Sequence, residues 1–76
     1  MTGRYMVKGL HIRLRQAVAD SNMTLTDIAR KSGIRREALW GYLNNYRTPT
    51  LYPLMRLSKA LNVSADWLLG LKEDRK

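Results

Sequence analysis

The sequence predicts a small all-α domain built from five short helices. Apolar residues recur at three- and four-residue spacing along most of the chain, and no stretch shows a convincing strand pattern. Ser and Thr at helix starts, and Gly and Asn at helix ends, separate the apolar runs. We divide the chain into an N-terminal arm (residues 1–8), a helical domain (residues 9–70) and a short C-terminal tail (residues 71–76).

The first two helices are predicted from apolar spacing and from their end residues. The first covers about residues 9–20, where one face carries an apolar residue every four positions: Leu10, Leu14 and Val18. The second begins after Thr24, a predicted N-cap, and Asp27 three residues later completes a pattern like a capping box. Ser32 and Gly33 end this helix, because glycine can adopt the positive φ of a helix C-cap.

The remaining three helices follow the same logic. The third covers about residues 36–45, and its inward stripe is Ala38, Leu39, Tyr42 and Leu43. The fourth follows the predicted N-cap Thr50 and ends at Asn62, which tolerates a left-handed conformation. Its buried face is predicted to be Leu54, Leu57 and Leu61. The fifth is short, begins after the N-cap Ser64 and closes at Gly70.

The charge balance is strongly basic and narrows the class of partner. Fourteen Lys and Arg stand against six Asp and Glu, a net charge of +8, which favours a nucleic-acid partner. No apolar run approaches the length that spans a membrane, and the N-terminus lacks the apolar core of a signal peptide. We therefore expect no membrane association and a cytoplasmic location, which the lack of cysteine fits.

Enzyme chemistry is not expected. The six acidic residues form no convincing catalytic pair, and no glycine-rich phosphate loop is present. His11 is the one histidine and has no cysteine with which to share a metal ion, so we interpret it as a surface residue. The sequence predicts no catalytic residue, no cofactor and no metal site.

Residues 24–45 carry the functional signal. Two short helices are joined by a tight turn at residues 32–34, which sets them at a steep angle so that the second projects from the surface. A projecting helix can enter the DNA major groove, where its N-terminal residues reach furthest. Those residues are Arg35, Arg36 and Glu37. Arg can bond guanine bidentately and Glu can accept from cytosine, so we predict Arg36 as the main base-reading residue.

Four further residues are predicted DNA contacts. We expect Arg47 and Asn44 to contact the sugar-phosphate backbone. Thr24, at the start of the preceding helix, is also a predicted DNA-binding residue. Trp40 lies off the inward stripe, so its exposed ring needs an explanation. Two interpretations stay open: the ring packs beside a thymine methyl or sugar, or it packs on Tyr46. The simpler interpretation of the arginines and Glu37 is a solvated helix start, with Glu37 answering the helix dipole.

Five segments, in their order and spacing, resemble the lambda repressor/Cro-like helix-turn-helix family, also called the xenobiotic-response-element class. They are MTLTDIA at 23–29, SGI at 32–34, TPT at 48–50, LSKALNVS at 57–64 and DWLLG at 66–70. The resemblance covers about residues 10–70. It implies five helices, operator DNA as the ligand, a bacterial or phage origin, and binding as a dimer.

The sequence departs from the family pattern at several positions. Leu25 replaces a glutamine that bonds a phosphate in most members, and Arg35 replaces a small hydroxyl cap. Val18 and Leu43 stand where several members have an Arg–Glu ion pair, and we expect the two to touch in the core. Gly41 occupies a position that reads a base in some members, so that side-chain contact is unavailable.

The predicted function is that of a transcription regulator, expected to be a repressor. It would read double-stranded operator DNA with the helix around residues 35–45, as a homodimer joined through its fourth and fifth helices and tail. The alternative is an antitoxin-type interaction module that binds a toxin partner and its own promoter. The tail at residues 71–76 is short for wrapping a toxin, which favours the regulator. RNA binding ranks third.

Overall fold

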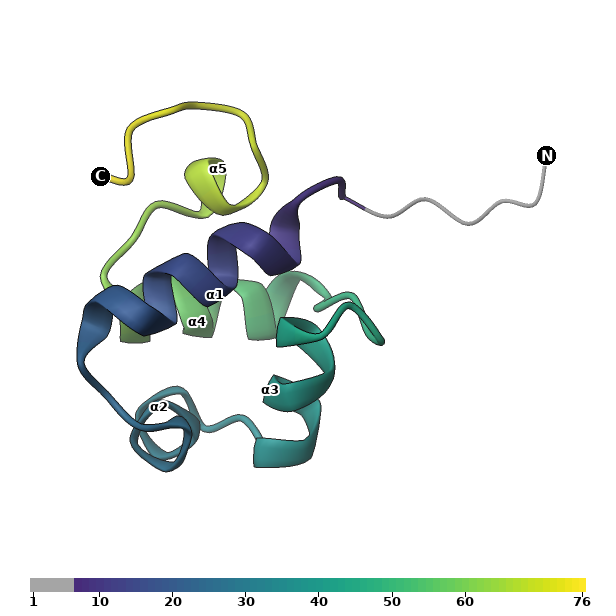
Figure 1. Cartoon of the computed structure of the whole chain (residues 1–76), viewed down its shortest axis with the longest axis vertical. Coiled ribbons are helices and arrows are strands. Elements are labelled where there is room, and N and C mark those ends of the chain that lie inside the picture. The colour runs from purple at the N-terminus through teal and green to yellow at the C-terminus, as the bar shows by residue number, and fades with distance from the viewer. Residues whose placement is uncertain (1–6) are drawn as a thin grey trace, which may run out of the picture.

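The computed structural model describes residues 7–76, which form five helices and no strand (Figure 1). In chain order they are α1 Leu10–Ser21, α2 Leu25–Ser32, α3 Arg36–Leu43, α4 Leu51–Leu61 and α5 Ala65–Leu68. In Figure 1, α1 and α4 cross the centre, α2 and the start of α3 lie on one side, and α5 and the tail lie on the other. The predicted fold class is confirmed. Most of the predicted N-terminal arm, residues 1–6, lies outside the described residues.

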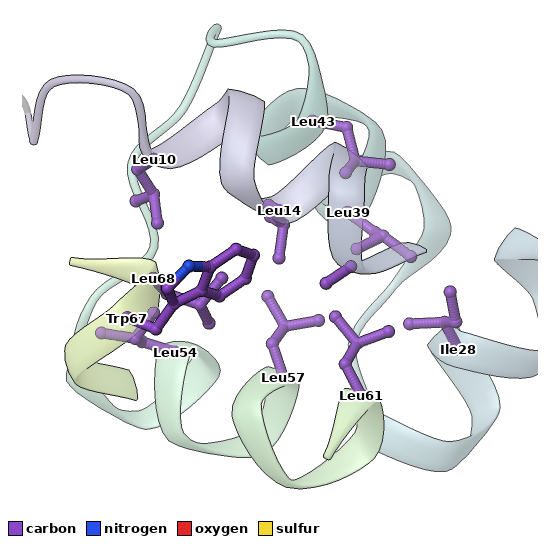
Figure 2. Packing of buried hydrophobic residues seen from close by; sticks show 11 residues of the cluster. Leu10, Leu14, Ile28, Leu39, Leu43, Leu54, Leu57, Leu61, Trp67 and Leu68 are labelled. Atoms are coloured by element: carbon purple, nitrogen blue, oxygen red, sulfur yellow. The ribbon is translucent and has the colours of Figure 1, made fainter. Parts of the chain in front are cut away.

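The core is made largely of leucine side chains, and all five helices contribute to it. Figure 2 shows them converging between α1, α4 and α5, with Ile28 reaching in from α2. The largest apolar side chains with no exposed surface are Leu14, Ile28, Leu39, Leu57 and Leu68. Burying one such side chain contributes about 1.5–3 kcal/mol. Leu43 is buried in this core and Val18 packs at its edge; their direct contact remains a prediction.

Most helix ends follow the sequence prediction. The Thr24 hydroxyl accepts the Asp27 N–H and the Asp27 carboxylate accepts the Thr24 N–H, which completes the capping box. Gly33 and Asn62 take positive φ, 72° and 56°, as helix C-caps. The Ser64 hydroxyl accepts from the first turn of α5. Short-range capping chemistry therefore sets these boundaries.

Some ends differ from the prediction. α1 covers residues 10–21 rather than 9–20, because Gly9 is its N-cap. α3 ends at Leu43 rather than Asn45, since Asn45 takes a φ of 63° and turns the chain back. Thr50 is the N-cap of α4, but its side chain accepts no capping hydrogen bond. The predicted side-chain cap at Thr50 is therefore wrong.

The C-terminal tail has no helix but folds back onto the domain. The Arg75 carbonyl accepts the Ser64 N–H, and the Arg75 guanidinium pairs with Asp20 of α1. The same guanidinium lies 5.0 Å from the centre of the Trp67 ring, as in a cation–π contact. The tail thus packs against α1 and α5.

Arg13 ties the start of the domain to its end. Its guanidinium donates to the Leu68 carbonyl at 2.9 Å and to the Lys8 carbonyl at 2.8 Å. It also lies against Gly9 and Gly70, where a Cβ atom would come within 2.9 Å of it. None of the helices in residues 7–76 has the length and apolarity needed to cross a membrane.

Candidate nucleic-acid interface

The turn between α2 and α3 is closed by local hydrogen bonds. The N–H groups of Gly33 and Ile34 both donate to the Ala29 carbonyl, at 2.8 and 3.1 Å. The buried Ser32 hydroxyl accepts a further bond from the Ile34 N–H. Three residues connect the helices, and each bond restricts how α3 can swing relative to α2.

Arg56 of α4 is hydrogen-bonded to this turn. Its Nε donates to the Ser32 carbonyl at 2.6 Å, at the C-terminal end of α2 where positive charge is favoured. Its Nη1 donates to the Tyr52 hydroxyl at 3.0 Å. Gly33 leaves room for the guanidinium, because a Cβ there would lie 2.7 Å from Nη2. Arg56 is therefore a structural residue that links α2 to α4.

The first turn of α3 is exposed, while its later residues anchor it. Leu39 and Leu43 are buried, whereas Arg35, Arg36 and Glu37 are exposed. Arg35 is the N-cap and makes no side-chain capping bond, as its replacement of a hydroxyl residue predicts. Among residues 7–76, neither arginine forms an ion pair. Two exposed cations therefore stand where the helix dipole disfavours them, with charge available for an anionic ligand.

The structure brings several predicted site residues together around one hollow. We call it the α2–α3 hollow; its volume is about 680 Å³ and its lining is Leu25, Arg35, Arg36, Glu37 and Trp40. Four of these are predicted DNA contacts. The fifth, Leu25, was noted only as a missing phosphate contact, and its position at the start of α2 opposite α3 could not be read from local pattern.

Thr24 and Asn44 are partly committed to the fold. The Thr24 hydroxyl accepts the cap bond from the Asp27 N–H. The pKa of the Asp27 carboxyl is lowered by hydrogen bonds from Thr24, of which the backbone N–H has the larger effect and the side chain the smaller. The Asn44 amide donates to the Trp40 carbonyl at 2.9 Å, which leaves one amide hydrogen and its oxygen for other partners.

Trp40 packs on Tyr46, which is one of the two interpretations that the sequence left open. The ring centroids are 5.4 Å apart and the planes differ by 10°. Trp40 nevertheless remains 53% exposed. The stack fixes the indole at the surface of α3 and leaves part of it facing the α2–α3 hollow.

Gly41 has a role that the sequence analysis missed. Its carbonyl accepts the N–H groups of Tyr46 and Arg47, at 2.8 and 3.2 Å, so the chain after α3 folds back onto the helix. A Cβ at Gly41 would lie 3.1 Å from Cγ and 3.2 Å from Cδ of Arg47. The Arg47 side chain thus packs over a position that glycine leaves open. A glycine inside a predicted helix, unfavourable by about 1 kcal/mol, was the available signal.

No metal site accompanies this surface in the described part of the chain. Within residues 7–76, no three His, Cys, Asp or Glu side chains gather closely enough to hold a metal ion. The chemistry that the surface offers is hydrogen bonding, positive charge and aromatic contact.

Known proteins resemble this chain over most of its length. The HTH-type transcriptional regulator ImmR of Bacillus subtilis is 38% identical over 61 residues, and the uncharacterized HTH-type transcriptional regulator YobD of the same species is 36% identical over 62. The alignments cover 80% and 82% of this chain but 48% and 55% of those relatives. The chain spans about half the length of the curated relatives it matches.

A solved structure and a family model complete the comparison. The restriction-modification controller protein C.AhdI from Aeromonas hydrophila superposes with a TM-score of 0.75 at 22% identity, over 82% of this chain and 94% of that one. At that identity the likeness shows the fold. The helix-turn-helix family model matches residues 14–68, which include the exposed turn of α3 and both helices that position it. The chain therefore belongs to the helix-turn-helix family, as its resemblance to the lambda repressor-like class predicts.

Proposed function

We propose that this chain is a sequence-specific DNA-binding transcription regulator, and we expect it to act as a repressor. The observation that carries the proposal is the exposed first turn of α3, with two arginines that form no ion pair within residues 7–76, on a turn held by Arg56. A rigid helix end with free cations suits entry into the major groove. The names of YobD and ImmR, which describe transcriptional regulators and no enzyme, support it.

Five side chains are assigned a role in this proposal. Arg36 reads a guanine through a bidentate pair of hydrogen bonds, and Glu37 accepts from a cytosine amino group. Arg35, one residue earlier, contacts a phosphate. Arg47 lies beyond the helix end, where its guanidinium meets the sugar-phosphate backbone. Thr24, at the start of α2, contacts the sugar-phosphate backbone.

The proposed binding unit is a homodimer. A domain of 76 residues covers too few base pairs for tight selection, so two copies would read half-sites about one helical turn, roughly 34–36 Å, apart. Exposed apolar side chains on α4 and the tail, Leu51, Tyr52 and Leu71, supply material for the interface. We place the protein in the cytoplasm, where bacterial or phage operators lie.

The first test is selection of bound sequences from a random DNA pool. A palindromic consensus is the expected result, because a symmetric dimer reads each half-site in the same way. Affinity should fall with salt, by a slope of about 0.9 per neutralised phosphate and with about four or more contacts per protomer. A slope near zero or a pool without enrichment would exclude this function. A single half-site bound by one chain would exclude the dimer.

The second test separates base reading from backbone contact. Arg36→Ala should lose affinity for the selected operator by about 1–3 kcal/mol while its binding to scrambled DNA changes little. Arg47→Ala should weaken both DNAs equally and lower the salt slope by about one unit. Both variants are measured by filter binding at two salt concentrations. If Arg36→Ala weakens both DNAs equally, base reading belongs to Arg35, Glu37 or Trp40 instead.

A further inference from the structure

The α2–α3 hollow has an apolar side that the proposed hydrogen bonds leave unused. Leu25 at the first position of α2 and Trp40 in α3 both line it, together with the arginines that are assigned to guanine and phosphate. Leu25 packs partly against the core, and Trp40 is backed by Tyr46. Both apolar residues belong to helices, Leu25 to α2 and Trp40 to α3.

Leu25 cannot make the phosphate contact that a glutamine would make at this position. A leucine has no donor for a phosphate, and a partly exposed leucine gains by covering apolar surface. Trp40, which also lines the hollow, is stacked on Tyr46. A ligand that enters the hollow would therefore meet both the hydrogen-bond donors of the arginines and the hydrocarbon of Leu25 and Trp40.

One group on the major-groove edge of DNA has that chemistry. The pyrimidine 5-methyl is apolar and projects into the groove beside hydrogen-bonding base edges. We propose that Leu25 and Trp40 form a binding site for a pyrimidine 5-methyl group, so that the protein specifies a methylated pyrimidine beside the base pair that Arg36 reads. This inference rests on the proposed DNA-binding function and assigns Leu25 and Trp40 as specificity-determining residues of the same surface.

The test removes one methyl group at a time from the selected operator. Each thymine is replaced in turn by deoxyuridine, which lacks the 5-methyl but keeps the same pairing edge. One position in each half-site should lose about fourfold in affinity per protomer, the factor that corresponds to about 0.8 kcal/mol for one buried methyl. Thymines elsewhere should show no change. A second arm compares cytosine with 5-methylcytosine at that position.

Protein variants then locate the effect. In Leu25→Ala and in Trp40→Ala, the ratio of affinities for thymine and deoxyuridine at that position should fall towards one. Ile12→Ala is the matched control, because Ile12 is an exposed aliphatic residue of α1 outside the hollow. It should keep the fourfold ratio. Thermal unfolding of each variant checks the fold, and the exposed Trp40 provides a variant that leaves the leucine core intact.

The outcomes are distinct. A methyl effect with thymine alone assigns the site to thymine, and an effect in both arms assigns it to any 5-methylpyrimidine; either supports the proposal. If no thymine is sensitive to loss of its methyl, or if the ratio persists in both variants, the methyl site is refuted while DNA selection stands. If the pool yields no consensus, the proposed function fails, and this inference fails with it.

Discussion

Replacing Gly41 by alanine should weaken DNA binding while leaving the protein as stable as before or more so. Alanine favours a helix interior over glycine by about 1 kcal/mol. The new Cβ would lie 3.1 and 3.2 Å from Cγ and Cδ of Arg47, a few tenths of an ångström too close. Arg47 is exposed, so its side chain can rotate away. The backbone bonds from Tyr46 and Arg47 to the Gly41 carbonyl survive this rotation.

The two effects can be given sizes. Stability should change by between zero and about +1 kcal/mol, which raises the melting temperature by up to about 4–8 °C in a domain of this length. Displacing the Arg47 guanidinium removes about one phosphate contact, a loss of about 0.9 in the salt slope. When salt rises fourfold, from 50 to 200 mM, the loss of affinity in Gly41→Ala should therefore be about 3.5-fold smaller than the loss in the unmodified protein.

The assay is a double-mutant cycle measured by thermal unfolding and by filter binding to operator and scrambled DNA. Gly41→Ala and Arg47→Ala should both lower affinity for the two DNAs alike, and the double variant should bind like Arg47→Ala alone. If Gly41→Ala weakens binding further when Arg47 is already alanine, Gly41 acts in another way. An unchanged salt slope in Gly41→Ala would refute the positioning of Arg47.

Three further predictions concern stability. Arg56→Ala should cost about 2 kcal/mol, since a charged donor to the end of α2 is lost, and lower the melting temperature by about 8–16 °C; an unchanged melting curve would remove Arg56 from the structural role. Leu43→Glu should cost several kcal/mol by burying a carboxylate, and adding Val18→Arg should recover part of it; unchanged melting of the single variant would contradict the burial of Leu43. The pKa of Asp27 is lowered in the fold, so its stabilising contribution is present above the ordinary value of 3.8 and is lost as pH falls through its folded pKa. Asp27→Asn should therefore flatten the melting temperature profile below pH 3.8, and parallel profiles would count against the capping box.

The helix ends that depend on neighbouring residues could be predicted from the sequence. The contacts between distant segments could not. Thr24, Gly33 and Asn62 set helix ends through bonds and φ angles that involve a few neighbours, so pattern alone located them. The return of Arg75 to Asp20 and the bond of Arg56 to the end of α2 join distant segments, and no local spacing announces them.

The candidate site divides in the same way. The exposed residues at 35–37 follow from where the turn ends and the helix starts, which the sequence shows. The packing of Arg47 over Gly41 depends on how the loop after α3 folds back, and Leu25 joins the site only because α2 and α3 cross. The sequence therefore predicted the charged residues and the position of their helix, whereas the packing between helices and loops could be seen only in the structure.

The stack of Trp40 on Tyr46 has a spectroscopic consequence. The chain holds two tryptophans in opposite surroundings, Trp40 being 53% exposed on the proposed DNA surface and Trp67 only 7% exposed beside the tail. Indole emission shifts to longer wavelength as its surroundings become more polar, so the two should emit at separable wavelengths. A Trp40→Tyr variant would leave emission that follows the packing of α5 and the tail, and a Trp67→Tyr variant would leave emission from the DNA-facing ring. Each domain thus contains one optical reporter of folding and one of ligand arrival, with no label added.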